Sequence, residues 1–373
     1  MFSNRVLRVG LAGAAISLFV SAPIAASAST PIVKAQTTTY TPAKAFNPSS
    51  AAVNGSTDVY HCTLINPHLS SDRYVTSSQL LPDKIKEVHH AIYFLIGPDQ
   101  VAKAQALNKN GNGWTCFGDP LNPNGQFGGT TWLGVWVPGH GANVAPADAG
   151  FRVPKGSEIV MQIHYNLLNG SKPDRSKVKL TTVPATDKKI QPMIIENLPA
   201  PPDLPCPTGV TGPLCDRTAS LQDLGQRFGA SAPQFVDGLE ATCKHDPASV
   251  VPDAQGLVST SCSFTMPADF YIRQVTPHMH LLGVASSVTL SHGGARMPVI
   301  TVDHYNFDEQ KSYTLKNPVK VSKGDTLTVS CTYNPKLRQR NPQLRKLPAR
   351  YVTWGDGSSD EMCLAITSVT ATK

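Results

Sequence analysis

The sequence lacks an apolar run long enough to cross a membrane as a helix, which needs roughly 20 residues. The run from Val9 to Val20 has only about a dozen residues and follows Arg5 and Arg8, and Ala26-Ser27-Ala28 comes after it as a small-residue cleavage site. This order is typical of a secretory signal peptide. We therefore predict that residues 1–28 are removed, that the mature chain has no membrane span, and that the protein is secreted or periplasmic.

Clusters of basic residues are also missing. The chain has 33 Lys and Arg against 26 Asp and Glu, a formal charge of +7, and loss of Arg5 and Arg8 with the signal peptide leaves +5. A mild excess without a patch gives no support for a nucleic-acid partner.

No Cys-x-x-Cys pair occurs, which argues against a cysteine-rich zinc site. The eight cysteines of an exported chain are instead natural disulfide candidates, and their even number permits full pairing. The sequence does not fix the connectivity. We predict local pairs: Cys62 with Cys116, Cys206 with Cys215, Cys243 with Cys262, and Cys331 with Cys363.

Helical patterns are scarce, and a turn or two between Leu221 and Leu239 is the most that we expect. Short β-branched runs separated by Gly, Pro or Asn indicate strands instead. Together with 31 prolines they predict an all-β protein built of β-sandwiches. The clearest strands are residues 91–96, 158–165, 286–291, 297–302, 326–333 and 363–370.

The mature chain, with 373 − 28 = 345 residues, is long for one core and suggests two domains. The Pro-rich stretch from Leu198 to Pro213 marks the seam, because neither a helix nor a central strand tolerates proline well. We expect a flexible leader at 29–56, an N-terminal domain at 57–197, a linker and disulfide-pinned insertion at 198–262, and a C-terminal domain at 263–373. We read the insertion from Cys206 to Cys262 as surface decoration; the alternative is that it lines or covers the cleft between the two domains.

Histidines with metal-ligand spacing are the main chemical signal. His278 and His280 stand two apart, so in an extended strand both project to one face and form half of a zinc, copper or iron site. The doublet His89-His90 can share a metal only at a strand end or bulge, since adjacent residues of a regular strand face opposite sides. Otherwise one of the two packs in the core and the other is solvated. His164 lies within a further predicted strand.

Met362 begins the last predicted strand, where a methionine usually packs in the core. Thioether sulfur is also a soft ligand that prefers Cu(I). If Met362 converges with His278 and His280, copper becomes the first choice of metal. A Cys331–Cys363 disulfide would then fix the residue beside it.

Four motifs in this order carry a family resemblance: His89-His90, Met161-Gln-Ile-His164-Tyr, His278-Met-His280-Leu-Leu-Gly, and Asp360-Glu-Met362-Cys. The chain resembles the copper type II ascorbate-dependent monooxygenases, the family of peptidylglycine α-hydroxylating monooxygenase and dopamine β-monooxygenase. The resemblance implies two antiparallel jelly-roll domains facing each other across a cleft, with one copper on each.

The resemblance also implies the role of each ligand. His89, His90 and His164 would hold an electron-transfer copper, and His278, His280 and Met362 the oxygen-binding copper. Ascorbate or a similar reductant would supply two electrons, and one atom of O2 would enter a substrate C–H bond. Gln162 and Tyr60 would lie behind the ligands, orienting them or assisting electron transfer; their alternative role is ordinary strand hydrogen bonding.

Three positions depart from the peptide-hydroxylating branch of the family. Thr276 stands where that branch has an arginine, and Leu364 and Ile366 stand where it has an asparagine and a tyrosine. Gripping a carboxylate requires charged or hydrogen-bonding partners, so these departures argue against peptide amidation. The substrate we expect is another small organic molecule.

Other functions remain open at this point. A non-catalytic copper protein for storage or delivery would use the same six ligands. A zinc hydrolase also needs three histidines with an open position, but apart from Glu87 no glutamate is placed to act as a general base. A lectin-like or glycan-processing jelly roll is possible by fold alone. The remaining histidines are read as structural or solvated: His68, His140, His245, His292 and His304.

Overall fold

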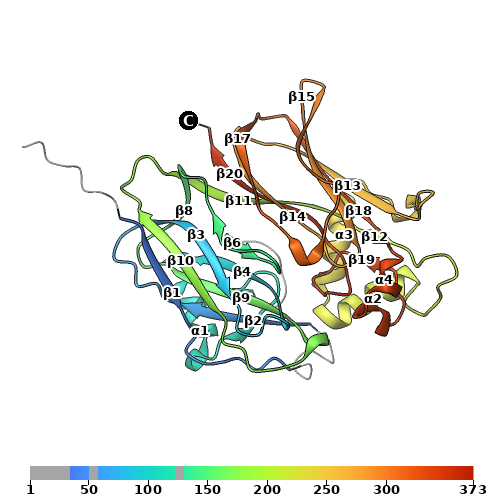
Figure 1. Cartoon of the computed structure of the whole chain (residues 1–373), viewed down its shortest axis with the longest axis horizontal. Coiled ribbons are helices and arrows are strands. Elements are labelled where there is room, and N and C mark those ends of the chain that lie inside the picture. The colour runs from blue at the N-terminus through green and yellow to red at the C-terminus, as the bar shows by residue number, and fades with distance from the viewer. Residues whose placement is uncertain (1–33, 50–57, 123–129, 373) are drawn as a thin grey trace, which may run out of the picture. The chain divides into compact units, whose positions relative to one another are not determined.

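Antiparallel strands are the main regular structure of the described chain, which in this computed structural model comprises residues 34–49, 58–122 and 130–372 (Figure 1). The predicted signal peptide lies outside these residues. The all-β prediction is confirmed, while jelly-roll strand order stays a prediction. No helix within the described ranges is long and apolar enough to cross a membrane.

The N-terminal half contains ten strands: β1 (Gln36–Tyr40), β2 (Asp58–Ile65), β3 (Arg73–Leu81), β4 (Val88–Ile96), β5 (Trp114–Thr115), β6 (Thr131–Trp136), β7 (Asn143–Val144), β8 (Ala149–Val153), β9 (Glu158–Asn166) and β10 (Lys177–Pro184). A five-stranded sheet runs in the order β5-β2-β9-β4-β6 and packs on the β1-β10-β3-β8 part of a larger sheet. Every residue of β9 is buried, because this strand lies in the centre of its sheet and is covered on both faces.

The C-terminal half contains the other strands: β11 (Gln191–Ala200), β12 (Asp203–Leu204), β13 (Val258–Thr265), β14 (Phe270–His278), β15 (Gly283–His292), β16 (Ala295–Val302), β17 (Tyr313–Val321), β18 (Thr326–Tyr333), β19 (Val352–Thr353) and β20 (Cys363–Ala371). The four-stranded sheet β13-β18-β15-β16 packs on β11-β20-β14-β17 around a second core. A short parallel pairing of β8 with β11, at Ala149–Gln191 and Gly150–Pro192, joins the two halves into one nine-stranded sheet.

The six strands predicted from sequence are all present, and they belong to β4, β9, β15, β16, β18 and β20. The predicted irregularity at the histidine doublet is also present, since the register of β4 against β9 shifts between Val88 and His90. The expectation that His278 and His280 lie in one strand is wrong. β14 ends at His278, and His280 lies just beyond the strand.

The helical content was underestimated. α2 (Arg217–Phe228) and α3 (Ser231–Cys243) are each three turns or more, where a turn or two was expected; α1 (Val101–Leu107) and α4 (Leu337–Arg340) are short. Asp216 caps α2 by accepting a hydrogen bond from the Ala219 backbone N–H, a signal that sequence inspection could have found. The apolar faces of α2 and α3 pack against Trp354 and Met362.

Two expected segments contain strands. Residues 36–40, within the supposed flexible leader, form β1 and pair with β10 from Gln36–Thr182 to Tyr40–Val178. The supposed linker begins inside β11, where Leu198, Pro199 and Ala200 pair with β20. β8 pairs only with the first residues of β11, so within the described residues the edge of β11 away from β20 has no partner strand near Pro199. A proline fits such an edge because it has no N–H to donate to a neighbouring strand.

Four disulfides hold these elements, and they are the pairs predicted from the sequence: Cys62–Cys116, Cys206–Cys215, Cys243–Cys262 and Cys331–Cys363. Such bonds suit an oxidising compartment outside the cytoplasm. The bond between Cys331 and Cys363 ties β18 to the first residue of β20, directly after Met362.

His61 gives the fold a pH dependence that can be measured. Its ring stacks on Phe46 at 3.6 Å between centroids, and burial lowers its pKa from 6.5 to about 4. The unfolded chain therefore binds a proton that the folded chain does not. This stability is complete above pH 6.5 and falls, by up to about 3 kcal/mol, as the pH drops towards 4. Denaturant unfolding at pH 7 and pH 4.5 measures this effect: the free energy of unfolding should fall less in His61→Phe than in the unmodified protein. An equal fall in both proteins would contradict the assignment to His61.

Candidate metal centre

His89, His90 and His164 converge where β4 lies beside β9. The Nδ1 atom of His164 lies 2.8 Å from Nδ1 of His89 and 3.3 Å from Nδ1 of His90. The ligand atoms of the three side chains lie within 4.8 Å of one another, and all three residues are buried. The register shift before His90 explains how neighbouring residues of one strand reach the same point.

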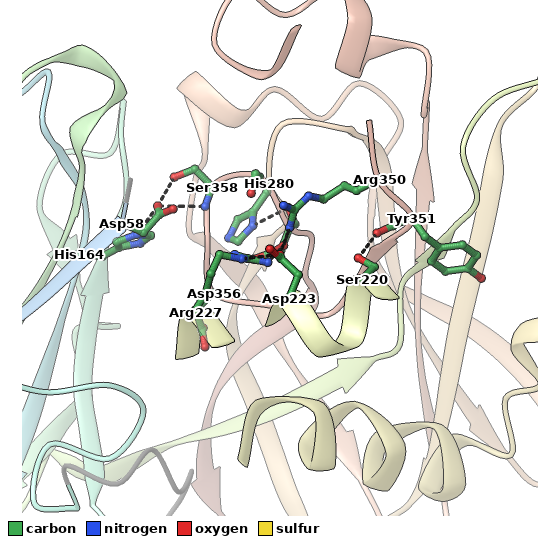
Figure 2. Close-up of polar contacts among 12 residues, drawn as sticks. Asp58, His164, Ser220, Asp223, Arg227, His280, Arg350, Tyr351, Asp356 and Ser358 are labelled. Carbon is green, nitrogen blue, oxygen red and sulfur yellow. Dashed lines mark hydrogen bonds and ion pairs between the residues drawn. The ribbon is translucent and has the colours of Figure 1, made fainter. Parts of the chain in front are cut away.

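Asp58 lies behind this triad. Nε2–H of His164 donates to Asp58 Oδ1 at 2.8 Å (Figure 2). The His164 Nδ1 lone pair is then directed at the other two rings. Burial opposes ionisation of Asp58, but hydrogen bonds from His164 and Ser358 outweigh it and lower the pKa to about 2. A carboxylate behind a histidine is the usual way to orient a metal ligand.

His278 and His280 form the second set, with ring centroids 5.2 Å apart. Nδ1 of His278 donates to Gln310 Oε1 at 2.7 Å, and Nδ1 of His280 donates to the Asp360 carbonyl at 3.1 Å. Both rings therefore keep Nε2 for a ligand role. Within the described part of the chain, Nε2 of His280 is buried without a hydrogen-bond partner, which is the arrangement that a bound metal would satisfy.

All five rings are buried. In four of them, burial disfavours the charged form. It lowers the pKa of His278 to about 4 and that of His280 to about 3, and it lowers the pKa values of His89 and His90 well below their ordinary range. These four imidazoles are thus neutral at physiological pH, the state in which a histidine binds a metal.

The two sets meet in one cluster instead of lying on opposite walls of a cleft. Ring centroids are 5.7 Å apart for His89 and His280 and 6.1 Å apart for His90 and His278. The Phe307 ring stacks on His89 at 5.0 Å and lies 6.4 Å from the His280 ring, between centroids. Groups held by the two sets would be close neighbours.

Met362 lies on the wall of a cavity of about 610 Å³ that is also lined by Tyr60, His90 and His278. Its backbone is fixed on two sides. Tyr333 Oη donates to the Met362 carbonyl at 2.8 Å, and the next residue is held by the Cys331–Cys363 disulfide. The structure thus brings Met362 to the same space as one histidine of each set.

Tyr60 and Gln162 differ in their relation to the cluster. The Tyr60 ring stacks on His164 at 4.2 Å between centroids, and its Oη lies 3.1 Å from His164 Nδ1. Gln162 lines the cavity, but its amide donates to the Gly118 carbonyl at 3.2 Å and faces the Cys62–Cys116 disulfide. Tyr60 therefore contacts the triad, while Gln162 lies beside the cavity.

Sequence inspection missed three orienting partners. Asp58 holds His164, Gln310 holds His278, and the Asp360 carbonyl holds His280. Asp58 had a usable signal, because it stands two residues before Tyr60 and so shares a face of β2 with it. Gln310 and the Asp360 carbonyl had none, since a loop side chain and a backbone atom follow no periodic pattern. Among the other histidines, His68 and His304 are exposed, and His292 pairs with Asp325 at 2.7 Å.

Removing the negative charge behind His164 should weaken the triad. We expect Asp58→Asn to bind Cu(II) or Co(II) at this triad about 10- to 100-fold more weakly, because the ring loses its orienting carboxylate. Competition titration with a chromophoric chelator measures the affinity. Asp72→Asn, which changes an exposed carboxylate paired with Arg152, is the matched control. Equal affinities for the two variants would show that Asp58 does not orient the ligand.

Comparison with solved structures gives only weak likenesses. A fucolectin from striped bass serum is 10% identical, with 91% of this chain and 96% of the lectin covered and a TM-score of 0.18. An oxalate decarboxylase of Bacillus subtilis is 6% identical, with 90% and 77% covered and a TM-score of 0.15. A 7S globulin of Momordica charantia is 9% identical, with 90% and 84% covered and a TM-score of 0.16. Scores of this size carry no argument.

Comparison with protein families is informative. Residues 239–367 match the C-terminal domain of the copper type II ascorbate-dependent monooxygenases. This range contains His278, His280 and Met362, as well as Gln310 and Asp360. The matched family depends on copper and ascorbate, which agrees with a cluster of neutral imidazoles beside a thioether. The C-terminal part of the chain, residues 239–367, thus matches the copper type II ascorbate-dependent monooxygenase family.

Proposed function

We propose that the protein holds two copper ions and hydroxylates a C–H bond of a small organic substrate, using O2 and ascorbate or a similar reductant. One observation carries the proposal. Two sets of buried histidines, one with three convergent Nδ1 atoms and one with two free Nε2 atoms, meet beside a cavity that Met362 lines.

In this proposal His89, His90 and His164 hold one copper, and His278, His280 and Met362 hold the other. Copper supplies reversible one-electron chemistry, and a thioether ligand favours its reduced state. The protein contributes neutral ligands, fixed ring orientations through Asp58, Gln310 and Asp360, and burial that limits access of water. Short separations between the two sets support electron transfer within the protein.

The cavity beside His278 is the natural place for the substrate. Leu364 lies opposite His278 in the β20–β14 register, and Ile366 lies opposite Thr276. Leu364 and Ile366 both line the cavity, whereas Thr276 is not among its lining residues. Two aliphatic side chains offer no partner to a carboxylate, which supports a substrate other than a peptide C-terminus.

The copper content provides a first test. Mature protein should bind two copper ions per chain, and Met362→Ile should weaken Cu(I) binding at the second set by about 10-fold or more while the first copper stays bound, because a hydrocarbon replaces the soft ligand. Metal analysis and X-ray absorption, which detects the sulfur scatterer, measure both effects. Met297→Ile, at an exposed methionine, is the control. One metal per chain, or zinc retained after copper loading, would refute the two-copper assignment.

Activity separates this proposal from a copper storage or delivery protein. Oxygen uptake in the presence of copper and ascorbate should depend on the added organic compound, and the product should gain one labelled oxygen atom from isotopically labelled O2. Uptake that never responds to any compound would favour the non-catalytic protein.

A further inference from the structure

The walls of the cavity point to the chemical class of the substrate. Four aromatic rings, those of Phe94, Trp132, Phe235 and Trp354, line it together with aliphatic side chains such as Val135 and Ile366. The histidines and Tyr60 occupy part of the wall. A volume of about 610 Å³ suits a molecule of drug size or smaller.

Charged groups that could receive an ionic substrate are few. Among the described lining residues there is no Lys or Arg, so nothing positive faces the space. The Asp119 carboxylate already accepts from Thr130 Oγ1 at 2.9 Å and from the Leu121 N–H at 2.8 Å. Burial raises the pKa of Asp356 to about 8, which leaves that group neutral at pH 7. Glu196 lines the cavity but is exposed to solvent.

We propose that the substrate is an uncharged, mainly apolar compound with an aromatic or alicyclic ring. A carboxylate or phosphate would lose its hydration without gaining a partner, whereas a ring packs against the aromatic walls at no such cost. This inference rests on the proposed function only in taking the cavity as the substrate site.

A matched series tests the charge rule. Phenylethanol, phenylethylamine and phenylacetate share a ring and differ in the charge of the end group. Calorimetry on the copper-loaded, oxidised protein should show that phenylethanol binds at least about 10-fold more tightly than either ion. Equal or tighter binding of an ion would overturn the class. Binding of the alcohol without ascorbate-dependent oxygen uptake would instead refute the proposed function and leave the class standing.

A variant provides the reverse test. Ile195 lines the cavity and is half-buried, so Ile195→Arg can place a cation at the wall with little disturbance of the core. It should weaken phenylethanol binding and strengthen phenylacetate binding, each by about 10-fold. Val144→Arg, at an exposed residue outside this cavity, is the control. If the two variants bind the series alike, the wall does not select the substrate.

A separate observation concerns the loop that precedes Met362. Residues 355–361, here the metal-site loop, are all buried although they include Asp356, Asp360 and Glu361. The loop folds tightly on itself, because the Asp360 N–H donates to the Gly357 carbonyl at 2.9 Å. A side chain at Gly357 would place its Cβ 2.6 Å from Asp360 Oδ2, so this position requires glycine.

The metal-site loop reaches the first histidine set through Asp58, which lies between Ser358 and His164 (Figure 2), and the second set directly at His280. On one side Ser358 donates to Asp58 Oδ1 through Oγ at 2.9 Å and through its backbone N–H at 3.1 Å, and Tyr60 Oη donates to the Asp356 carbonyl at 2.7 Å. On the other side the Asp360 carbonyl accepts from His280. One short segment thus stands behind His164 and His280 together.

Helix α2 anchors this loop. Both terminal nitrogens of Arg227 donate to the Asp360 carboxylate at 2.7 Å, and Arg227 Nε donates to Asp223 at 2.8 Å. Arg350 joins the same network through Asp223 at 2.8 Å. Two parallel bonds from a guanidinium fix both the position and the plane of a carboxylate. The region expected to be surface decoration therefore reaches the candidate metal centre.

We infer that Arg227 is a positioning residue for the second copper set and that the metal-site loop couples the two sets. Given the copper assignment above, Arg227→Met should leave Asp360 with only its longer, 3.4 Å contact to Arg350. It should therefore weaken Cu(I) binding at His278, His280 and Met362 by about 10-fold, with a reduced sulfur signal in X-ray absorption. Arg227→Lys keeps the charge and should restore part of the affinity. Ser358→Ala should change the Cu(II) resonance spectrum of the first set.

Arg217→Met is the matched control, because Arg217 lies on the same helix but pairs with Asp203 and Glu240 away from the loop. It should lower stability without changing copper affinity or spectra. If Arg227→Met behaves like Arg217→Met, with a lower melting temperature and unchanged copper binding, Arg227 is merely structural and the inference fails.

Discussion

The burial of five imidazoles in one place is the constraint on which the rest of the structure depends. A buried imidazole loses hydration, and a nitrogen without a partner, such as Nε2 of His280, costs free energy in the folded chain. Burial also keeps His278 and His280 neutral, with pKa values of about 4 and 3. The fold therefore bears a cost that a metal ion would offset, and the cost itself preserves the protonation state that metal binding needs.

The groups around the cluster explain how this arrangement is held. Each orienting contact comes from a different element: Asp58 from β2, Gln310 from the chain before β17, and Asp360 from the loop before β20. Asp360 belongs to the metal-site loop, and Asp58 accepts a hydrogen bond from Ser358 of the same loop. Arg227 of α2 holds the loop in place by pairing with Asp360. The Cys331–Cys363 disulfide fixes its far end. Ring orientation is thus distributed over both halves of the chain.

The wall beside the cluster gives the site a chemical character of its own. Leu364 and Ile366 lie on the strand that pairs with β14, and together with Trp132 and Trp354 they make an apolar surface next to His278.

The sequence by itself determined the chemistry of the site and the class of the fold. Residue types fix which atoms can bind a soft metal, and alternation and β-branching indicate the strands. The sequence left the disulfide connectivity open, and the structure confirmed the predicted local pairs. Helix α2 was underestimated although Asp216 was a usable cap signal, and the N-cap residue of α3, Ala230, provides no side-chain cap. β1 was missed because a five-residue edge strand carries little periodicity of its own. Only the tertiary structure decided that the two histidine sets form one cluster and that Asp58, Gln310, Asp360 and Arg227 stand behind them. These contacts join residues up to about 300 positions apart, as Asp58 and Ser358 show, and local sequence patterns hold no information about such distances.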